Sequence, residues 1–263
     1  MQLSFDAADR LVELVEARRG PVPVDDAARR LFALSSAPTG IARSLLEDVV
    51  AGDARLSWRG AAIGLATQTA LEDPLESAHF VVLDLETTGM DPRTDRIVAL
   101  AAVRWGPHGE ETSFVSLVDP GRPIPASATA IHGLDDAAVR GAPRLEDLLP
   151  GFRATIGERV PVAHMGAFDL AFLQRPLGRA GLPRLERMLD TAVLAARLLP
   201  PLPDLSLDAV CARLGVPVSG RHTALGDARL AARVLKELLP ELERRGASRL
   251  RDALHWGDVT RAP

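Results

Sequence analysis

Two carboxylates stand at the end of the most apolar run of the chain. In the segment Val82-Leu83-Asp84-Leu85-Glu86, Asp84 and Glu86 are two residues apart. Because side chains alternate along a strand, both carboxylates would point to the same face. Two buried like charges are unstable unless a cation lies between them, and oxygen ligands of this kind suit Mg²⁺ or Mn²⁺. The segment therefore predicts a metal site, and its alternative is a pair of acids in a solvated loop just past the strand.

Two further segments carry an aspartate at the start of a helix. Asp169 follows a strand in the segment VAHMGAFDLAFL, and Asp227 lies in the segment RHTALGDA, where Thr223 is the expected helix cap. His222 would then stay in the loop before that helix. An imidazole beside a metal-binding carboxylate is placed to remove a proton from a water molecule that the metal activates. The alternative is that each aspartate only favours the positive end of its helix and that His222 is a surface residue.

The elements that must position these residues follow from hydrophobic periodicity. After residue 77 the pattern alternates between short apolar runs and amphipathic stretches. We expect strands over residues 79–85, 96–105, 112–118 and 159–163. We expect helices over residues 134–140, 145–156, 168–180, 191–199, 205–214 and 224–245. Three strands followed by strand and helix alternation indicate an α/β domain, which we place at residues 78–245 with a C-terminal tail at residues 246–263.

The first part of the chain has a different plan. Helical patterns over residues 10–19, 25–35 and 41–50 precede two short strands within residues 55–65. Three short helices followed by a hairpin are typical of a winged helix-turn-helix, so we expect a winged-helix-like α+β module at residues 1–66. The polar segment 67–77, which contains a proline, is the expected linker.

Composition limits the function classes that remain. The chain has 263 residues, 31 basic and 35 acidic groups, a net charge of −4 and one cysteine, Cys211. No apolar run approaches the roughly 20 residues that span a bilayer, and the first residues do not resemble a secretion signal, so we expect a cytoplasmic protein without a membrane partner. Counted by region, residues 1–66 carry −1, residues 67–77 carry −3 and residues 78–263 carry zero. Four acids of the last region are the expected metal ligands, so its remaining surface is cationic.

Taken together, the three segments resemble the DEDD exonucleases, in particular the subgroup with a catalytic histidine that includes the proofreading epsilon subunit of bacterial DNA polymerase III and ribonuclease T. The segment from Asp84 to Gly89, the segment from His164 to Asp169, and the pair His222 and Asp227 match the three family motifs in order. The segments AIHGL (130–134) and LSLDAVC (205–211) also resemble the family. Two positions depart from it: Met165 stands where the family usually has Asn, and Ala99 where it often has Glu.

The resemblance implies an RNase H-like fold with a mixed five-stranded sheet flanked by helices, and two divalent metal ions, Mg²⁺ or Mn²⁺. It implies that Asp84 bridges both ions, that Glu86 and Asp227 complete one site, and that Asp169 supports the other. His222 would act as the general base, and nucleoside 5′-monophosphates would leave from the 3′ end. Our candidates for holding the terminal nucleotide are Thr87, Thr88, His132 and Phe168.

Several functions stay open at this point. The leading one is 3′-to-5′ cleavage of single-stranded DNA, in repair, proofreading or end trimming, and an exoribonuclease is the nearest alternative. The last residues show no clear clamp-binding peptide, which favours a stand-alone enzyme over a polymerase-associated proofreader. A different class is a DNA-binding regulator that uses the nuclease fold as a scaffold. The first module could bind duplex DNA or dock a protein, since its helix 41–50 offers only Arg43 against Glu47 and Asp48.

Overall fold

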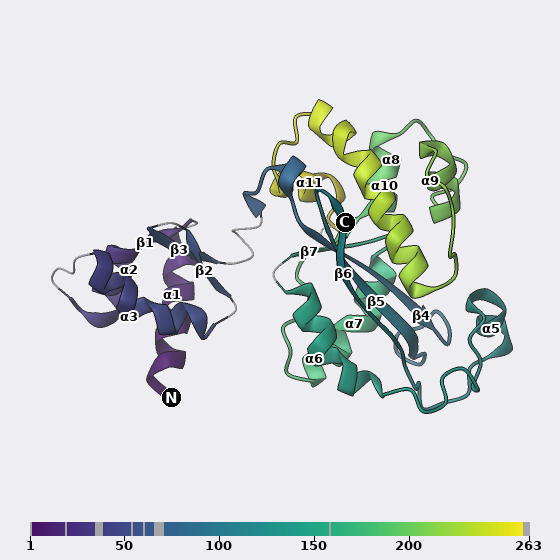
Figure 1. Cartoon of the computed structure of the whole chain (residues 1–263), viewed down its shortest axis with the longest axis horizontal. Coiled ribbons are helices and arrows are strands. Elements are labelled where there is room, and N and C mark those ends of the chain that lie inside the picture. The colour runs from purple at the N-terminus through teal and green to yellow at the C-terminus, as the bar shows by residue number, and fades with distance from the viewer. Residues whose placement is uncertain are drawn as a thin grey trace. The chain divides into compact units, whose positions relative to one another are not determined.

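The chain divides into two compact units, residues 1–73 and residues 74–263 (Figure 1). The computed structural model describes residues 2–18, 20–34, 39–53, 55–59, 61–65, 71–157 and 159–259. Residues 67–70 of the expected linker and residues 260–263 of the expected tail lie outside this part. None of the helices described in these ranges combines the length and the apolar character needed to cross a membrane.

The first unit contains three helices and a three-stranded antiparallel sheet. The sheet has the order β1-β3-β2, with Val22 opposite Ile63 and Leu56 opposite Leu65. Its core is formed by fully buried residues from every helix, including Leu11, Ala27 and Leu46. The elements are α1 (Gln2–Arg18), β1 (Val22–Pro23), α2 (Val24–Phe32), α3 (Thr39–Ala51), β2 (Leu56–Arg59) and β3 (Ala62–Leu65).

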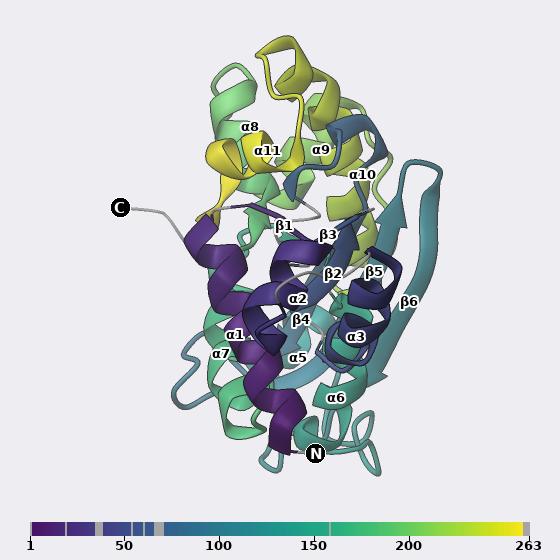
Figure 2. The same cartoon turned by 90° about the vertical axis from the view of Figure 1, so that its left-hand side faces the viewer.

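The second unit is built on a mixed five-stranded sheet, as the family resemblance implies, with β8 as a strand that the residue pattern did not predict. Its order is β6-β5-β4-β7-β8, in which the first three strands pair antiparallel and β4, β7 and β8 pair parallel. The edge strand β6 lies on the outside of this sheet (Figure 2). The strands are β4 (Phe80–Thr87), β5 (Ile97–Gly106), β6 (Gly109–Leu117), β7 (Val160–Ala163) and β8 (Leu189–Asp190).

Helices cover both faces of the sheet (Figure 1). On one face, Leu83 and Leu85 of β4 join a core with side chains of α6 and α7, such as Phe152 and Leu173. On the other face, α10 packs across β4 and β5 and contacts α8 and α9. The helices are η1 (Leu75–Ser77), α5 (Ala126–His132), α6 (Leu145–Ile156), α7 (Ala167–Arg179), α8 (Thr191–Leu198), α9 (Leu207–Leu214), α10 (Ala224–Arg244) and α11 (Leu250–Gly257).

The helix expected over residues 134–140 is wrong. A helix forms earlier, over Ala126–His132, and ends at Gly133, which adopts the left-handed conformation with φ 74°. Residues 136–141 are turns, and the Asp135 carboxylate accepts hydrogen bonds from the backbone of Ala137 and Ala138. Aspartate makes such local bonds readily, so it favours a turn over continuation of a helix.

Two segments outside the predicted elements are ordered by contacts with the second unit. Residues 250–257, which we assigned to a tail, form α11, and this helix packs against α8 and β8. Leu75, in the expected linker, is buried in η1, and its N–H donates to the Ser248 carbonyl. The sequence analysis did not predict α11, although it predicted α8 and α9, which are equally short.

Candidate active site

Three carboxylates converge where β4 ends and α10 begins. One oxygen from each of Asp84, Glu86 and Asp227 lies within 4.8 Å of the other two. Asp84 and Glu86 face α10 because they alternate with Leu83 and Leu85, which enter the core on the opposite face. Alternation along the strand therefore aims both acids at the first turn of α10, as the sequence predicts.

Asp169, in the first turn of α7, is not one of these three residues, but its charge acts on one of them. Its side chain is buried, and its charge is one of the causes that raise the pKa of Asp84. Burial is the main cause that raises the pKa of Asp169 itself, to which the charges of Asp190 and Glu86 add. All four predicted acids are thus electrostatically coupled, although they come from three elements far apart in the sequence.

Burial and the charges of neighbouring acids disfavour the charged forms of Asp84 and Glu86. Burial raises the pKa of Asp84 most, followed by the charges of Asp169 and Asp227. Burial and then the Asp227 charge raise the pKa of Glu86 to about 7, against an opposing effect of Arg221. In addition, Asp227 Oδ1 is buried without a hydrogen-bond partner among the described residues. A buried acceptor without a partner is rare, so this group of hard oxygens fits a divalent cation.

An arginine that the sequence analysis did not single out contacts the acids. Arg221 donates through Nη1 to Asp227 Oδ2, and through Nε and Nη2 to the two oxygens of Asp208, at 2.8 and 3.2 Å. The Arg221 side chain is 20% exposed. It is a cation that offsets part of the repulsion in the cluster, since its charge lowers the pKa of both Asp84 and Glu86.

The loop before α10 is closed by short-range contacts. Thr223 caps the helix as predicted, because its hydroxyl accepts from the Gly226 N–H at 3.1 Å, and it also donates to the Gly220 carbonyl at 2.7 Å. An ideal Cβ at residue 226 would lie 1.8 Å from that carbonyl oxygen, so only glycine permits this approach. His222 has φ 58°, its N–H donates to Asp227 Oδ2 at 3.3 Å, and its side chain is exposed.

The Asp190 carboxylate, which the sequence analysis did not predict to be important, stabilises the turn before α7. Asp190 accepts from the N–H groups of Met165 and Gly166 at 3.1 and 2.8 Å, and it also caps α8 through Ala192 and Val193. Its side chain is 2% exposed. The signal that could have found Asp190 is an aspartate directly before the helical pattern of residues 191–199.

His164 belongs to the same buried arrangement. Its Nε2–H donates to the Leu205 carbonyl at 2.7 Å, and its Nδ1 lies 2.9 Å from the Thr191 hydroxyl. Burial is the main cause that lowers the pKa of His164, so the neutral ring is favoured. His164 therefore connects the turn before α7 to α8 and to the segment that leads into α9.

The four residues expected to hold a nucleotide lie next to the acids but are largely engaged within the protein. Thr87 and Thr88 are buried, and their hydroxyls donate to the Gly89 carbonyl at 2.6 Å and to Asp95 at 3.0 Å. His132 is also buried. Its Nε2–H donates to the Thr87 carbonyl at 3.2 Å, and its Nδ1 accepts from the backbone at 3.1 Å.

Phe168 is the fourth of these residues, and it lies in the first turn of α7. It is half-buried, and its ring centroid lies 4.8 Å from that of Phe172. Its exposed part is the portion of the ring available to a ligand, whereas the ring nitrogens of His132 already have partners. The nucleotide-holding roles of all four residues stay predictions.

Comparison with known proteins identifies the family. Residues 81–235 match the exonuclease family of ribonuclease T. The chain belongs to this exonuclease family. The chain is 42% identical over 190 residues to a DNA polymerase III subunit epsilon-like protein of Rhodobacter capsulatus, a match that covers 70% of this chain and 27% of that protein. It is 33% identical over 173 residues to the DNA polymerase III subunit epsilon of Aquifex aeolicus, a match that covers 65% of this chain and 86% of that subunit.

Other relatives are much longer than this chain. A DNA polymerase III PolC-type protein of Clostridium perfringens is 34% identical over 158 residues, a match that covers 60% of this chain and 11% of that protein. This exonuclease therefore spans only about a quarter or less of the first relatives that it matches.

Solved structures share the fold of the second unit. Exonuclease X in complex with 5′ overhanging duplex DNA gives a TM-score of 0.52 at 28% identity, over 66% of this chain and 97% of that chain. The nuclease domain of 3′hExo, a DEDDh family member bound to rAMP, gives a TM-score of 0.55 at 16% identity, over 66% of this chain and 96% of that chain. The arrangement of strands and helices is thus that of RNase H-like exonucleases.

The structure gives the setting of both departures from the family pattern. Met165 adopts a left-handed conformation, with φ 58°, and is 51% exposed. Asn tolerates this conformation better than most residues, which gives a backbone reason for the usual family residue. Ala99 lies directly opposite Glu86 in the β4–β5 register and is 6% exposed. A glutamate at that position would lie beside Glu86.

Proposed function

We propose that this exonuclease hydrolyses phosphodiester bonds from the 3′ end of single-stranded nucleic acid, with DNA favoured, and releases nucleoside 5′-monophosphates. The observation that carries this proposal is the group of Asp84, Glu86 and Asp227, whose oxygens lie within 4.8 Å of one another with one buried oxygen unpaired. The family of the chain and the names of its relatives support the direction and the substrate class.

The four acids would hold two divalent ions, Mg²⁺ or Mn²⁺. Asp84 would contribute to both, Glu86 and Asp227 to one, and Asp169 to the other. Such ions, when bound, activate water and stabilise the negative charge that develops on the attacking and leaving oxygens. The raised pKa values of Asp84, Glu86 and Asp169 agree with this role, since a bound cation would restore the charged form that burial disfavours.

His222 would take the proton of the attacking water. Its backbone N–H contacts Asp227, which places the residue at the edge of the acidic group, and its exposed ring can exchange that proton with solvent. Arg221, held by Asp208, would orient Asp227 and keep the loop of His222 closed on α10. The unpaired Oδ1 of Asp227 would stay available to a cation while Oδ2 is held.

End-labelled oligonucleotides test the reaction and its direction. A 5′-labelled single strand should give a ladder of shortened products with Mg²⁺ or Mn²⁺, whereas a 3′-labelled strand should release labelled mononucleotide at once. Parallel DNA and RNA strands compare the favoured substrate with an exoribonuclease. Asp84→Asn, which keeps the shape of the side chain, should abolish the metal-dependent cleavage. If this variant digests DNA at the wild-type rate, the carboxylate cluster is not the catalytic site, and if neither protein cuts, a DNA-binding regulator becomes the better proposal.

The relatives named as DNA polymerase III subunits support a role in proofreading, repair or trimming beside a polymerase. Co-purification of the full chain with the polymerase III catalytic subunit of its own organism tests this association. Retention on the polymerase after a high-salt wash favours the proofreader, and its absence favours a stand-alone enzyme.

The first unit is proposed to be a winged helix that docks a protein. The order of its elements and the β1-β3-β2 sheet support the fold. On α3, the exposed apolar side chains of Ile41 and Leu45 lie beside Glu47 and Asp48, a surface that would repel phosphate. Residues 1–73 have a core of their own, so a gel shift of this fragment with duplex DNA at low salt is a direct test. Binding in the micromolar range would favour the DNA-binding alternative.

A further inference from the structure

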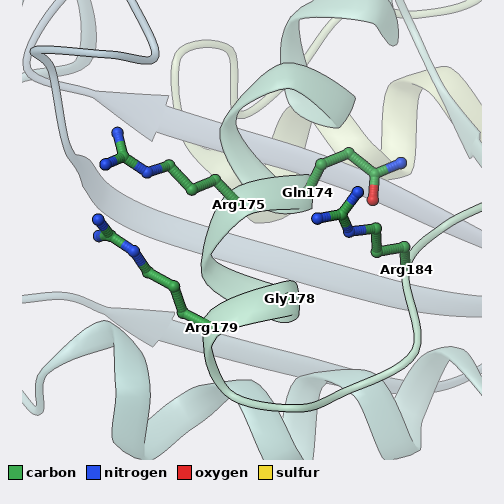
Figure 3. Close-up of a pocket in the computed structure, with 5 residues that line it drawn as sticks. All are labelled: Gln174, Arg175, Gly178, Arg179 and Arg184. Carbon is green, nitrogen blue, oxygen red and sulfur yellow. The ribbon is translucent and has the colours of Figure 1, made fainter.

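The second half of α7 and the chain after it carry an arginine surface, which we define as Arg175, Arg179 and Arg184. These side chains line a recess of about 460 Å³ together with Gln174 and Gly178 (Figure 3). All three arginines are exposed. None of the ion pairs within the described part of the chain engages them, and no acidic residue lines this recess.

The geometry of this surface favours a row of anions. Arg175 and Arg179 are one helical turn apart, and their guanidinium groups extend side by side in the same direction (Figure 3). Arg184 comes from the chain after α7 and rests against the helix at Gly178. An ideal Cβ at residue 178 would lie 3.1 Å from its Nε and Nη2, so the glycine leaves room for the guanidinium.

A second recess, of about 260 Å³, adjoins this surface on α7. Arg175 and Arg179 line both recesses. The second recess also contains Phe172, one turn after Asp169, and Arg96, whose carbonyl accepts from the Thr88 N–H at 2.8 Å. The second recess thus lies along α7, which carries Asp169 in its first turn, and beside the loop that follows β4.

Charge in the second recess is also positive on balance. Two of its three acids are engaged by neighbours: Asp95 accepts from Thr88 and from the backbone of Asp91, and Asp119 pairs with Arg144 at 3.2 Å. Around the two recesses, six arginines face three acids. The arginines are Arg93, Arg96, Arg144, Arg175, Arg179 and Arg184, and the acids are Asp95, Asp119 and Glu146.

The distance between the two α7 arginines and the carboxylate cluster suits contact with a more distant part of a bound strand, rather than with its terminal nucleotide. Arg175 and Arg179 follow Asp169 by six and ten residues, which is about 9 and 15 Å along a helix axis at roughly 1.5 Å per residue. At about 3.4 Å per nucleotide along a strand, these residues would lie roughly three to five nucleotides from the bond that is cut.

We propose that the arginine surface binds the phosphodiester backbone of the nucleic acid, about three to five nucleotides away from the 3′ end held at the carboxylate cluster. This inference rests on the proposed function. Guanidinium groups bind phosphate oxygens in pairs of hydrogen bonds, and such contacts position a strand without reading its sequence. The bound backbone is that of the cleaved strand or of a complementary strand, and the experiment distinguishes the two.

The test compares the full-length wild type with Arg175→Ala/Arg179→Ala on substrates of two lengths. At about 50 mM salt, kcat/KM for a single-stranded 12-mer should fall roughly 10-fold or more, mainly through KM, because two phosphate contacts are lost. A dinucleotide is too short to reach the arginines, so its cleavage should change less than about 2-fold. For the 12-mer, the slope of log kcat/KM against log salt concentration should become less negative by about 1.4.

Two further variants make the result specific. Arg175→Lys/Arg179→Lys keeps the charge and should keep the wild-type salt slope. Arg233→Ala/Lys236→Ala removes the same charge from exposed positions of α10, where Arg233 follows Asp227 by six residues, as Arg175 follows Asp169. This matched pair should leave cleavage of the 12-mer within about 2-fold of the wild type.

The outcomes separate the inference from the function on which it rests. A wild type that cleaves neither substrate refutes the proposed nuclease activity. An active wild type overturns the inference if Arg175→Ala/Arg179→Ala behaves like it on both the 12-mer and a hairpin with a two-nucleotide 3′ tail, if the dinucleotide loses as much as the longer substrates, or if the α10 pair causes the same loss. A loss confined to a hairpin with a two-nucleotide 3′ tail assigns the contact to the complementary strand, and a loss with the single strand assigns it to the cleaved strand.

Discussion

The turns that lead into α7 and α10 contain the same kinds of residue, but the histidine of the first is held within the protein and that of the second is exposed. Each contains a histidine, each contains a residue with φ 58°, and each presents an aspartate from the first turn of its helix. In the turn before α7, His164 is held at both ring nitrogens. In the loop before α10, the side chain of His222 is exposed. Burial, rather than residue type, decides which histidine is part of the scaffold and which is free to exchange a proton.

The largest effect that we expect comes from exchanging the two histidines for alanine. His222→Ala should lower kcat by about 10²- to 10⁴-fold with an unchanged midpoint of urea unfolding, because the ring would act in proton transfer and lies in solvent. His164→Ala should instead lower the free energy of unfolding by about 2 kcal/mol, because the Leu205 carbonyl and the Thr191 hydroxyl lose a buried partner. Unchanged cleavage by His222→Ala would remove this residue from the mechanism.

The second prediction compares the carboxylates that support the two turns. Asp190→Ala should destabilise the protein by about 3 kcal/mol, because four backbone N–H groups lose a buried acceptor. Asp208, which holds Arg221, has a side chain that is 54% exposed, so Asp208→Ala should cost less than about 1 kcal/mol. Urea unfolding of both variants measures the difference, and equal losses would mean that the two turns are supported alike.

The third prediction concerns how the stability of the protein depends on pH, because α7 and α10 each present an aspartate to the acidic residues of β4. The pKa of Glu86 is raised from 4.5 to about 7, so between these values the folded, metal-free protein binds the proton and the unfolded chain does not. The stability from this group is therefore complete below about pH 4.5 and falls as pH rises toward 7, by roughly 2 kcal/mol after solvent screening.

Asp84 and Asp169 also have raised pKa values, so they act in the same direction as Glu86. Urea midpoints in EDTA from pH 5 to pH 8 would show the decline. Glu86→Gln should remove part of this decline in stability with pH, and millimolar Mg²⁺ should remove most of it. A stability that rises over this range in EDTA would contradict the electrostatic description of the site.

The smallest effect concerns Met165, the left-handed residue of the turn before α7. Met165→Asn should stabilise the protein by about 1 kcal/mol, since a left-handed conformation costs most side chains roughly 1–2 kcal/mol and asparagine less. The melting temperature should rise by about 2–4 °C. Met165→Ile, with a branched Cβ, is the control and should lower it. A lower melting temperature for the asparagine variant would show that the methionine side chain makes a compensating contact.

The sequence predicts those parts of the site that follow a local rule. Alternation along a strand was enough to bring Asp84 and Glu86 to one face, and helix capping was enough to place Thr223 and Asp227. Arg221 was not predicted, because its partners lie 13 residues before it and 6 residues after it, and their meeting depends on the packing of α9 beside α10. Local patterns specify an element and its face, whereas contacts between elements need the fold.

The same limit explains the expectations about the nucleotide-holding residues and the helix over 134–140. The hydroxyl of Thr88 is used by Asp95, a contact between positions seven residues apart that the sequence did not indicate, while the nucleotide-holding role of the backbone near Thr87 and Thr88 stays a prediction. The helix was expected too late because Gly133 was not interpreted as a stop, although a left-handed glycine commonly ends a helix. The three-stranded meander of β4, β5 and β6, in contrast, followed from short turns and apolar runs and was predicted correctly, whereas the two-residue strand β8 was not predicted.

The division of the chain into two units with separate cores has a consequence for how a substrate is found. Residues 1–73 and 74–263 are joined covalently, so a partner captured by the first unit is kept near the second at an effective concentration set by the chain between them. Tethering of this kind can raise the apparent affinity for a substrate by orders of magnitude without any new contact at the carboxylates. Under the proposed function, the small first unit would in this way decide which 3′ ends are cleaved, while the chemistry of cleavage stays the same.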